Sequence, residues 1–167
     1  MLEVRFPLPL PRATLDYHID NLGGMILISG TVGAATEAVL KGIHAAAFSG
    51  ATGSQISYTT LDNGTSPLTP TALTYAALIL NINYPSTTNC TTPSAFKFVL
   101  TRINVDANAT DVRTCGPDHL LDESSAIALP GCFVTVSVFN PSTKGDVDSK
   151  TQALVLSKLK SLLSCPS

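Results

Sequence analysis

One stretch of the 167-residue chain constrains the fold more than any other part. A short apolar run, Met25–Ile28, leads into the polar turn Ser29–Thr31. Apolar residues then recur at helical spacing over Val32–Lys41, and after a very short connection Ala45–Phe48 forms a second apolar run. The order strand, turn, helix, strand predicts a βαβ unit with a right-handed crossover, and therefore an α/β fold.

The turn in this unit predicts an anion-binding position. A helix that begins right after a strand points its unpaired N–H groups, and the positive end of its dipole, out of the sheet. Gly30 removes the side chain that would block an anion, and Ser29 and Thr31 can add hydroxyl donors. This chemistry suits a phosphate or a carboxylate. The spacing leaves an alternative open, in which Ser29 and Thr31 only cap the helix.

The same residues resemble a known family. The run Ser29-Gly30-Thr31-Val32-x-Ala34-Ala35-x-Glu37 is similar to the signature of the SurE family of metal-dependent phosphatases and nucleotidases. Upstream, Asn21-Leu22-Gly23 resembles the end of the family's Ser-Gly-x-Asn-x-Gly-x-Asn-x-Gly loop. Downstream, Leu80–Pro85 resembles its Leu-Asn-Val-Asn-x-Pro strand, and the cysteine-bearing tail is similar to that of secreted fungal members. The resemblance extends from Asn21 to the end of the chain.

The resemblance implies a three-layer, Rossmann-like α/β fold with a parallel or mixed sheet, truncated at the N-terminus and ending in a strand, a loop and a helix. It divides the chain into a divergent segment, 1–20, and a partial SurE-like domain, 21–167. The implied activity is hydrolysis of a small phosphate monoester or nucleotide, as in an acid phosphatase or a 5′(3′)-nucleotidase. The residues implied to bind the phosphate are Asn21, Ser29, Gly30 and Thr31.

The implied cofactor is a divalent metal, Mg²⁺ or Mn²⁺, and here the chain departs from the family pattern. SurE-like enzymes are implied to hold the metal with an Asp-Asp pair, a serine and the first asparagine of the glycine-rich loop. The sequence has no Asp-Asp pair, and Tyr17 takes the place of that asparagine. Asp16, His18 and Asp20 would share one face of an extended segment, but such strings are mostly solvated surface. We assign no metal ligand from the sequence.

Three hypotheses about function remain at this stage. The first is a SurE-like phosphatase, active or inactive as a truncated chain. The second is a noncatalytic secreted module that binds an anionic ligand. The third is a gene product that does not fold stably, because a sheet without its first strands exposes an unpaired edge.

The composition limits the kinds of molecule that the chain is expected to bind. The net charge of −2 gives no electrostatic basis for binding a nucleic-acid polymer, and no apolar run approaches the length of a membrane span. The expected partner is therefore a small-molecule phosphate monoester or nucleotide. The resemblance also implies a homodimer, because the C-terminal elements of SurE relatives often exchange between subunits.

The cysteines predict disulfides, since four of them occur without the close spacing of zinc sites. A bridge between Cys132 and Cys165 would fasten the C-terminal helix to the sheet and leave Cys90 with Cys115. Four cysteines allow three connectivities, so this pairing is a hypothesis.

Three glycosylation sequons, at Asn63, Asn89 and Asn108, together with the cysteines predict a secreted or endomembrane protein. The start of the chain, Met1–Pro11, shows no export signal, which conflicts with that prediction.

The rest of the chain predicts several further elements. Asn104–Pro130 is polar and irregular, and Asp118 and His119 within it are interpreted as a surface loop. A capping box, Ser149–Gln152, precedes the last helix. The expected strands are Thr14–Ile19, Gln55–Thr59, Leu80–Tyr84, Phe96–Ile103 and Cys132–Phe139, and the expected helices are Thr71–Leu78 and Ala153–Leu163.

Overall fold

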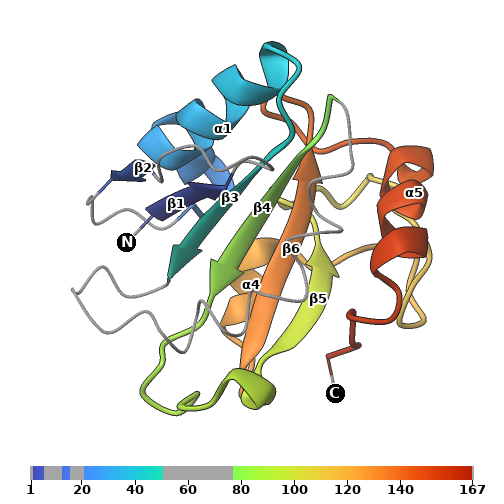
Figure 1. Ribbon diagram of the computed structural model, residues 1–167. Helices are drawn as coiled ribbons and strands as arrows, with labels where there is room; N and C mark the ends of the chain where they lie inside the picture. The colour runs from blue at the N-terminus through green and yellow to red at the C-terminus, as the bar shows by residue number, and fades with distance from the viewer. Residues whose placement is uncertain (1, 6–12, 16–20, 51–76, 167) are drawn as a thin grey trace.

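The structure is a computed structural model that describes residues 2–5, 13–15, 21–50 and 77–166. Its strands are β1 (Leu2–Arg5), β2 (Ala13–Leu15), β3 (Ala45–Gly50), β4 (Ile79–Tyr84), β5 (Lys97–Thr101) and β6 (Phe133–Phe139). Its helices are α1 (Gly30–Leu40), α4 (Glu123–Ile127) and α5 (Ser149–Leu159), and two 3₁₀ turns are η1 (Gly23–Leu27) and η2 (Pro93–Ala95). The strands form one sheet in the order β2-β1-β3-β4-β6-β5 (Figure 1).

The sheet is mixed. Strands β3 and β4 are parallel, as are β5 and β6, whereas β4 is antiparallel to β6 and β1 is antiparallel to β3. Helices α1 and α4 contact one face of the sheet, and α5 packs on the other. The predicted three-layer α/β fold with a mixed sheet is confirmed.

The predicted strand over Met25–Ile28 is wrong. Most of this run belongs to η1, and the edge of β3 that does not face β4 is already paired with β1. Of the four residues only Ile26 is buried, whereas Leu27 and Ile28 are 62% and 68% exposed. Helix α1 therefore starts from a short turn and not from a strand. The helix and the second strand of the same stretch are confirmed as α1 and β3.

Alternation along the strands gives the sheet two different faces. In β4, Leu80 and Ile82 point to one face, while Asn81 and Asn83 point to the other. We call the first the apolar face, defined by Phe48, Leu80, Ile82, Tyr84, Phe98, Leu100, Val134, Val136 and Val138. We call the second the polar face, defined by the buried residues Ser49, Asn81, Asn83, Thr101, Thr135 and Ser137.

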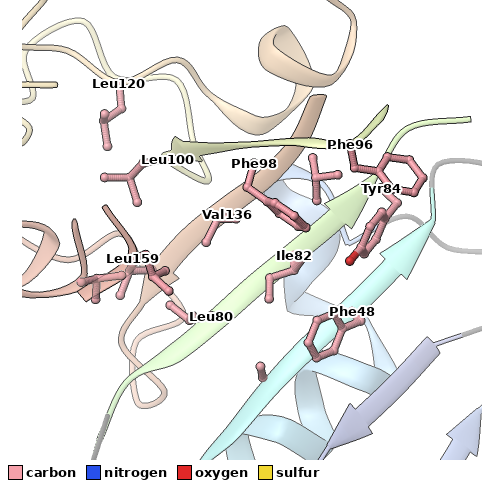
Figure 2. Close-up of a cluster of buried hydrophobic side chains, with 14 of the residues drawn as sticks. Phe48, Leu80, Ile82, Tyr84, Phe96, Phe98, Leu100, Leu120, Val136 and Leu159 are labelled. Atoms are coloured by element: carbon pink, nitrogen blue, oxygen red, sulfur yellow. The ribbon is translucent and has the colours of Figure 1, made fainter. Parts of the chain in front are cut away.

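Helix α5 covers part of the apolar face (Figure 2). Val155 and Leu159 are fully buried there, and Leu156, Leu162 and Leu163 are partly buried against the same cluster. The predicted apolar side of this helix is confirmed, and it packs on the sheet of its own chain. Leu162 and Leu163 lie beyond the helix, which ends at residue 159.

The start of α5 differs from the prediction. Its N-cap is Asp148, whose side chain accepts a hydrogen bond from the Thr151 N–H at 2.8 Å. The hydrogen bonds from the Thr151 side chain and backbone also hold the pKa of Asp148 below its usual value. The capping box predicted over Ser149–Gln152 is therefore wrong. The Gln152 side chain instead accepts from the Val112 N–H at 2.7 Å.

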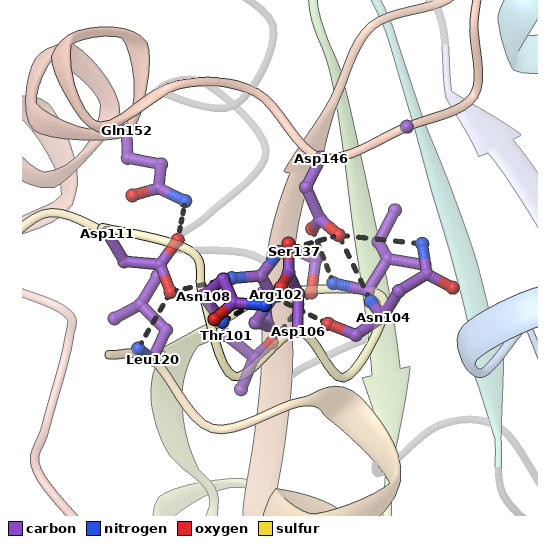
Figure 3. Close-up of polar contacts among 12 residues, drawn as sticks. Thr101, Arg102, Asn104, Asp106, Asn108, Asp111, Leu120, Ser137, Asp146 and Gln152 are labelled. Carbon is purple, nitrogen blue, oxygen red and sulfur yellow. Dashed lines mark hydrogen bonds and ion pairs between the residues drawn. The ribbon is translucent and has the colours of Figure 1, made fainter.

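A cluster around Arg102 ties the loop after β5 to α5 (Figure 3). The buried guanidinium lies 3.0 Å from Asp111 and 3.6 Å from Asp146. Gln152 of α5 donates to the same Asp111 at 2.7 Å, and Asp146 accepts from the Ile103 N–H. The polar segment that the sequence describes only as irregular is thus held by buried ionic contacts.

The disulfide pairing predicted from the sequence is wrong. Cys90 pairs with Cys132 and Cys115 with Cys165, with Cα–Cα distances of 5.7 and 5.3 Å. The reason lies in the sheet, because parallel β5 and β6 start side by side and bring the segment before β5 next to Cys132. The use of all four cysteines in disulfides is as predicted.

Several predicted features fall outside the described residues. They are the strand Gln55–Thr59, almost all of the helix Thr71–Leu78, the sequon at Asn63 and most of the strand Thr14–Ile19, of which β2 covers the beginning. The strands predicted at 80–84, 96–103 and 132–139 are confirmed as β4, β5 and β6. Within the described ranges, no helix is long and apolar enough to cross a membrane.

Candidate anion-binding site

The predicted site residues meet where η1 turns into α1. Ser29 is the N-cap of α1, and its hydroxyl oxygen accepts from the Val32 N–H at 3.2 Å. The same hydroxyl donates to Oδ1 of Asn21, which is fully buried. The alternative that Ser29 caps the helix is therefore observed. Its hydroxyl makes both bonds within the protein, and it is 4% exposed.

Four donors remain around this bend. The first N–H groups of a helix have no partner within it, and here the N–H groups of Val32 and Gly33 bond to Ser29. The N–H groups of Gly30 and Thr31 have no hydrogen-bond partner among the described residues; Gly30 is exposed, whereas Thr31 is buried. Nδ2 of Asn21 is buried and has no hydrogen-bond partner among the described residues. The hydroxyl of Thr31 is also buried without such a partner.

The polar face of the sheet lies beneath the bend. Ser49, Asn83 and Thr135 occupy paired positions on neighbouring strands β3, β4 and β6. Ser49 accepts from the Asn21 N–H at 3.2 Å and donates to Oδ1 of Asn83. Asn81 donates to the backbone oxygen of Asn21 at 2.6 Å. Asn21 is thus held to the sheet through its backbone, which leaves its side chain for Ser29.

Glu123, the first residue of α4, completes this network. It is fully buried, and its carboxylate accepts from the Gly23 N–H at 3.0 Å, from Asn81 at 2.7 Å and from Asn83 at 3.2 Å. Burial raises the pKa of Glu123 to about 8, against the opposing effect of hydrogen bonds from Gly23, Ser137 and Asn81. Near neutral pH this side chain is therefore mostly a neutral carboxylic acid.

The described residues do not fit a divalent metal ion. Such ions prefer several carboxylate, carbonyl or water oxygens. Glu123 is the one acid of the network, and its oxygens already accept from N–H groups. In the described ranges no group of three or more His, Cys, Asp or Glu could hold a metal. The Asp16, His18 and Asp20 string lies outside these ranges.

Comparison with family models gives one match, to the family described as survival protein SurE, over residues 18–110. The matched region is more than half of the chain and contains the bend, α1, β3, β4 and β5. The chain belongs to the SurE family. The match ends before α4, β6 and α5, although β6 belongs to the same sheet and both helices pack on it. Searches of curated proteins and of solved structures gave no significant match.

The sequence pointed to part of this candidate site. It singled out Asn21, Ser29, Gly30 and Thr31, which the structure places in one bend. It missed Glu123 and the helix that carries it, inside a segment predicted to be irregular. One available signal was Asp122, an N-cap residue whose side chain accepts from the Ser125 N–H at 3.0 Å.

The other candidates lie apart from the bend. Asp118 and His119 are exposed, 3.8 Å apart, in the surface loop that was predicted. His119 lines an apolar hollow of about 220 Å³ beside Cys115 and Pro166. Asn89 and Asn108, the described sequon residues, are both exposed.

Proposed function

We propose that this chain binds small-molecule phosphate monoesters at the N-terminus of α1 and acts as a phosphoric monoester hydrolase of the SurE type, an acid phosphatase or a 5′(3′)-nucleotidase. The observation that carries the binding is the donor set of the Gly30 and Thr31 N–H groups with the unpartnered Nδ2 of Asn21. Helix N-termini with small residues favour phosphate groups, because their unpaired N–H groups and the positive end of the helix dipole face the anion.

In this proposal Ser29 does not contact the ligand but positions the groups that do. It fixes the direction of the first turn of α1 and the orientation of the Asn21 amide, so that Oδ1 faces Ser29 and Nδ2 is left for a ligand. The hydrolytic step is supported by membership in the SurE family, which generally depends on a divalent metal. The described residues supply no metal site and no group that activates water, so we derive no chemical step from them.

A second candidate function is favoured by the difference between a metal-dependent family and described residues that supply no metal site. A noncatalytic module would use the bend to bind an anion without turning it over. Loss of metal assistance removes the usual source of a nucleophile at neutral pH, but it leaves hydrogen-bonding donors in place. The two candidates share the binding site and differ only in turnover.

One experiment separates them. The 167-residue chain is assayed on 5′-AMP and 3′-AMP with Mn²⁺, with Mg²⁺ and with EDTA, and binding of the same nucleotides is measured by calorimetry. Metal-dependent turnover supports the hydrolase, and binding without turnover supports the noncatalytic module. Absence of both would contradict the proposal.

Gly30→Val tests the place of binding. A branched side chain at the helix start would shield the Gly30 and Thr31 N–H groups, and we expect affinity to fall at least about tenfold. Gly33→Val is the matched control, because a Cβ at Gly33 meets nothing within 4 Å. Equal affinities of the two variants would remove the bend from the proposal.

We also propose that the protein is exported and glycosylated. Two disulfides and the exposed sequon residues Asn89 and Asn108 support this. A homodimer through the C-terminal elements remains a proposal as well, which the molar mass in solution tests.

A further inference from the structure

The proposed binding at the bend does not explain why a buried acid, Glu123, lies beneath it. An isolated carboxyl group is unfavourable inside a protein, and an apolar residue would fill the same space more stably unless the acid organises its neighbours. Glu123 accepts hydrogen bonds from separate parts of the chain, among them the Gly23 N–H in η1, the amides of Asn81 and Asn83 in β4, and the Ser137 side chain in β6.

These contacts continue without a break to the helix start. Asn81 donates both to Glu123 and to the backbone oxygen of Asn21, and Asn21 accepts from Ser29, the N-cap of α1. All the side chains in this path are buried. The Gly23 contact holds the other end of the same short loop, in which Gly23 has a φ of +51°. Glu123 thus holds residues 21–23 at both ends, directly at Gly23 and through Asn81 at Asn21.

We propose that Glu123 is a positioning residue for the phosphate site, which holds the loop Asn21–Gly23 to the sheet and thereby aims the Asn21 amide and the first turn of α1 at the ligand. This inference rests on the proposed function of the bend. It adds a residue that contacts no ligand itself and acts through Asn81, Gly23 and Asn21.

Glu123→Gln is the informative substitution. A carboxyl group can accept on both oxygens, whereas the glutamine side chain of the same shape has one oxygen and one N–H₂ donor. If its oxygen faces Asn81 and Asn83, its nitrogen faces the Gly23 N–H, donor against donor. The loop should therefore be released at one end while the volume of the side chain is preserved.

Asp111→Asn is the matched control. Asp111 is also a buried carboxyl group with several partners, Arg102, Leu120 and Gln152, but it lies in the Arg102 cluster and not in the path to α1 (Figure 3). Both substitutions replace a buried acid by its amide. Only the change at Glu123 should affect the bend.

The test measures AMP affinity by calorimetry and exchange of the Gly23 amide hydrogen by NMR, under conditions in which all proteins are folded. We expect Glu123→Gln to weaken AMP binding about tenfold and to speed exchange at Gly23, while Asp111→Asn leaves the affinity within about twofold. Equal loss of affinity in both variants, or none in Glu123→Gln, overturns the inference. If the unmodified protein binds no AMP, the proposed function fails, and this inference fails with it.

The unmodified protein provides a second readout should Glu123→Gln not fold. Ionisation of Glu123 places a negative charge beneath the site, so AMP affinity should fall severalfold between pH 7 and pH 9, a range in which a phosphate monoester with a second pKa of about 6 stays a dianion. Strands β4 and β6 present no charged side chain to Glu123. In the described ranges, Asp146 acts on Glu123 electrostatically, Asp122 precedes it in the chain, and Arg102 accepts from the Glu123 N–H through its backbone oxygen. A constant affinity over this range overturns the inference.

Discussion

The two faces of one sheet differ in what their side chains do. On the apolar face, residues such as Leu80, Ile82 and Val136 pack with α5 and the aromatic side chains of Tyr84 and Phe98 (Figure 2). On the polar face, Asn81, Asn83 and Ser49 occupy positions of the same strands that are just as deeply buried. Burial of apolar surface stabilises the fold, whereas buried amides and hydroxyls do so only when they are well paired.

The pairing on the polar face is incomplete at the bend. Nδ2 of Asn21, Oδ1 of Asn81 and the Thr31 hydroxyl are buried without partners among the described residues. Leaving buried polar atoms unpaired costs free energy, and natural proteins tolerate this mainly at functional sites. The comparison teaches that the apolar face stabilises the fold throughout, whereas on the other face the polar residues at the bend give up stability to position donors beside the apolar contacts of α1.

The comparison of the two faces predicts that the largest loss of folding stability follows a substitution on the apolar face. Leu159→Ala deletes a fully buried side chain and should lower the free energy of unfolding by about 4 kcal/mol, measured by chemical denaturation. AMP affinity of the folded variant should not change. Leu154→Ala on the same helix, where the side chain is 62% exposed, should lower the free energy of unfolding by about 0.5 kcal/mol or less. A strong loss of AMP binding in folded Leu159→Ala would show that the faces are not separable.

The disulfides should contribute the next largest effect. Replacing both Cys115 and Cys165 by Ser removes a link across 50 residues, and we expect a loss of about 3 kcal/mol, again without a change in AMP affinity. Peptide mapping without reduction should find Cys90 joined to Cys132. A Cys132 to Cys165 peptide would instead restore the pairing expected from the sequence.

The sequence predicted the apolar face better than the polar one, for a physical reason. Alternation of apolar residues in β5 and β6 and the helical spacing of Val155 and Leu159 reflect burial directly, so the pattern alone identifies them. The run Met25–Ile28 has the same apolar character but is mostly exposed. What decides its structure is the pairing of β1 with β3, a contact between distant segments that no local pattern records.

The candidate site was predictable only where its residues form a local motif. Ser29, Gly30 and Thr31 are consecutive, and their chemistry can be read from the turn itself. The role of Glu123 depends on contacts with Gly23 and Asn81, 100 and 42 residues away in sequence. Its helix has five residues, too few for a periodic pattern. Besides Asp122, the sequence carried a second signal, the pair of asparagines Asn81 and Asn83 in a strand, where asparagine is depleted.

The smallest of these effects concerns pH and tests the polar face directly. The pKa of Glu123 is about 8 in the folded protein and 4.5 in an ordinary environment, so the folded state binds the proton more tightly. The stability that the neutral acid contributes is fully present below pH 4.5 and is lost as the pH rises through 8. Between pH 6 and pH 8 the free energy of unfolding should fall by about 2 kcal/mol from this group.

Denaturation curves at several pH values measure this slope, and Glu123→Gln should flatten it because glutamine does not titrate. Leu159→Ala should lower the whole curve and keep its slope, since it removes contacts from the face that holds no titrating group of this network. If Glu123→Gln kept the slope of the unmodified protein, the acid would be charged and stably paired at neutral pH. The polar face would then resemble the Arg102 cluster, in which the carboxylates of buried Asp111 and partly buried Asp146 are matched by a cation.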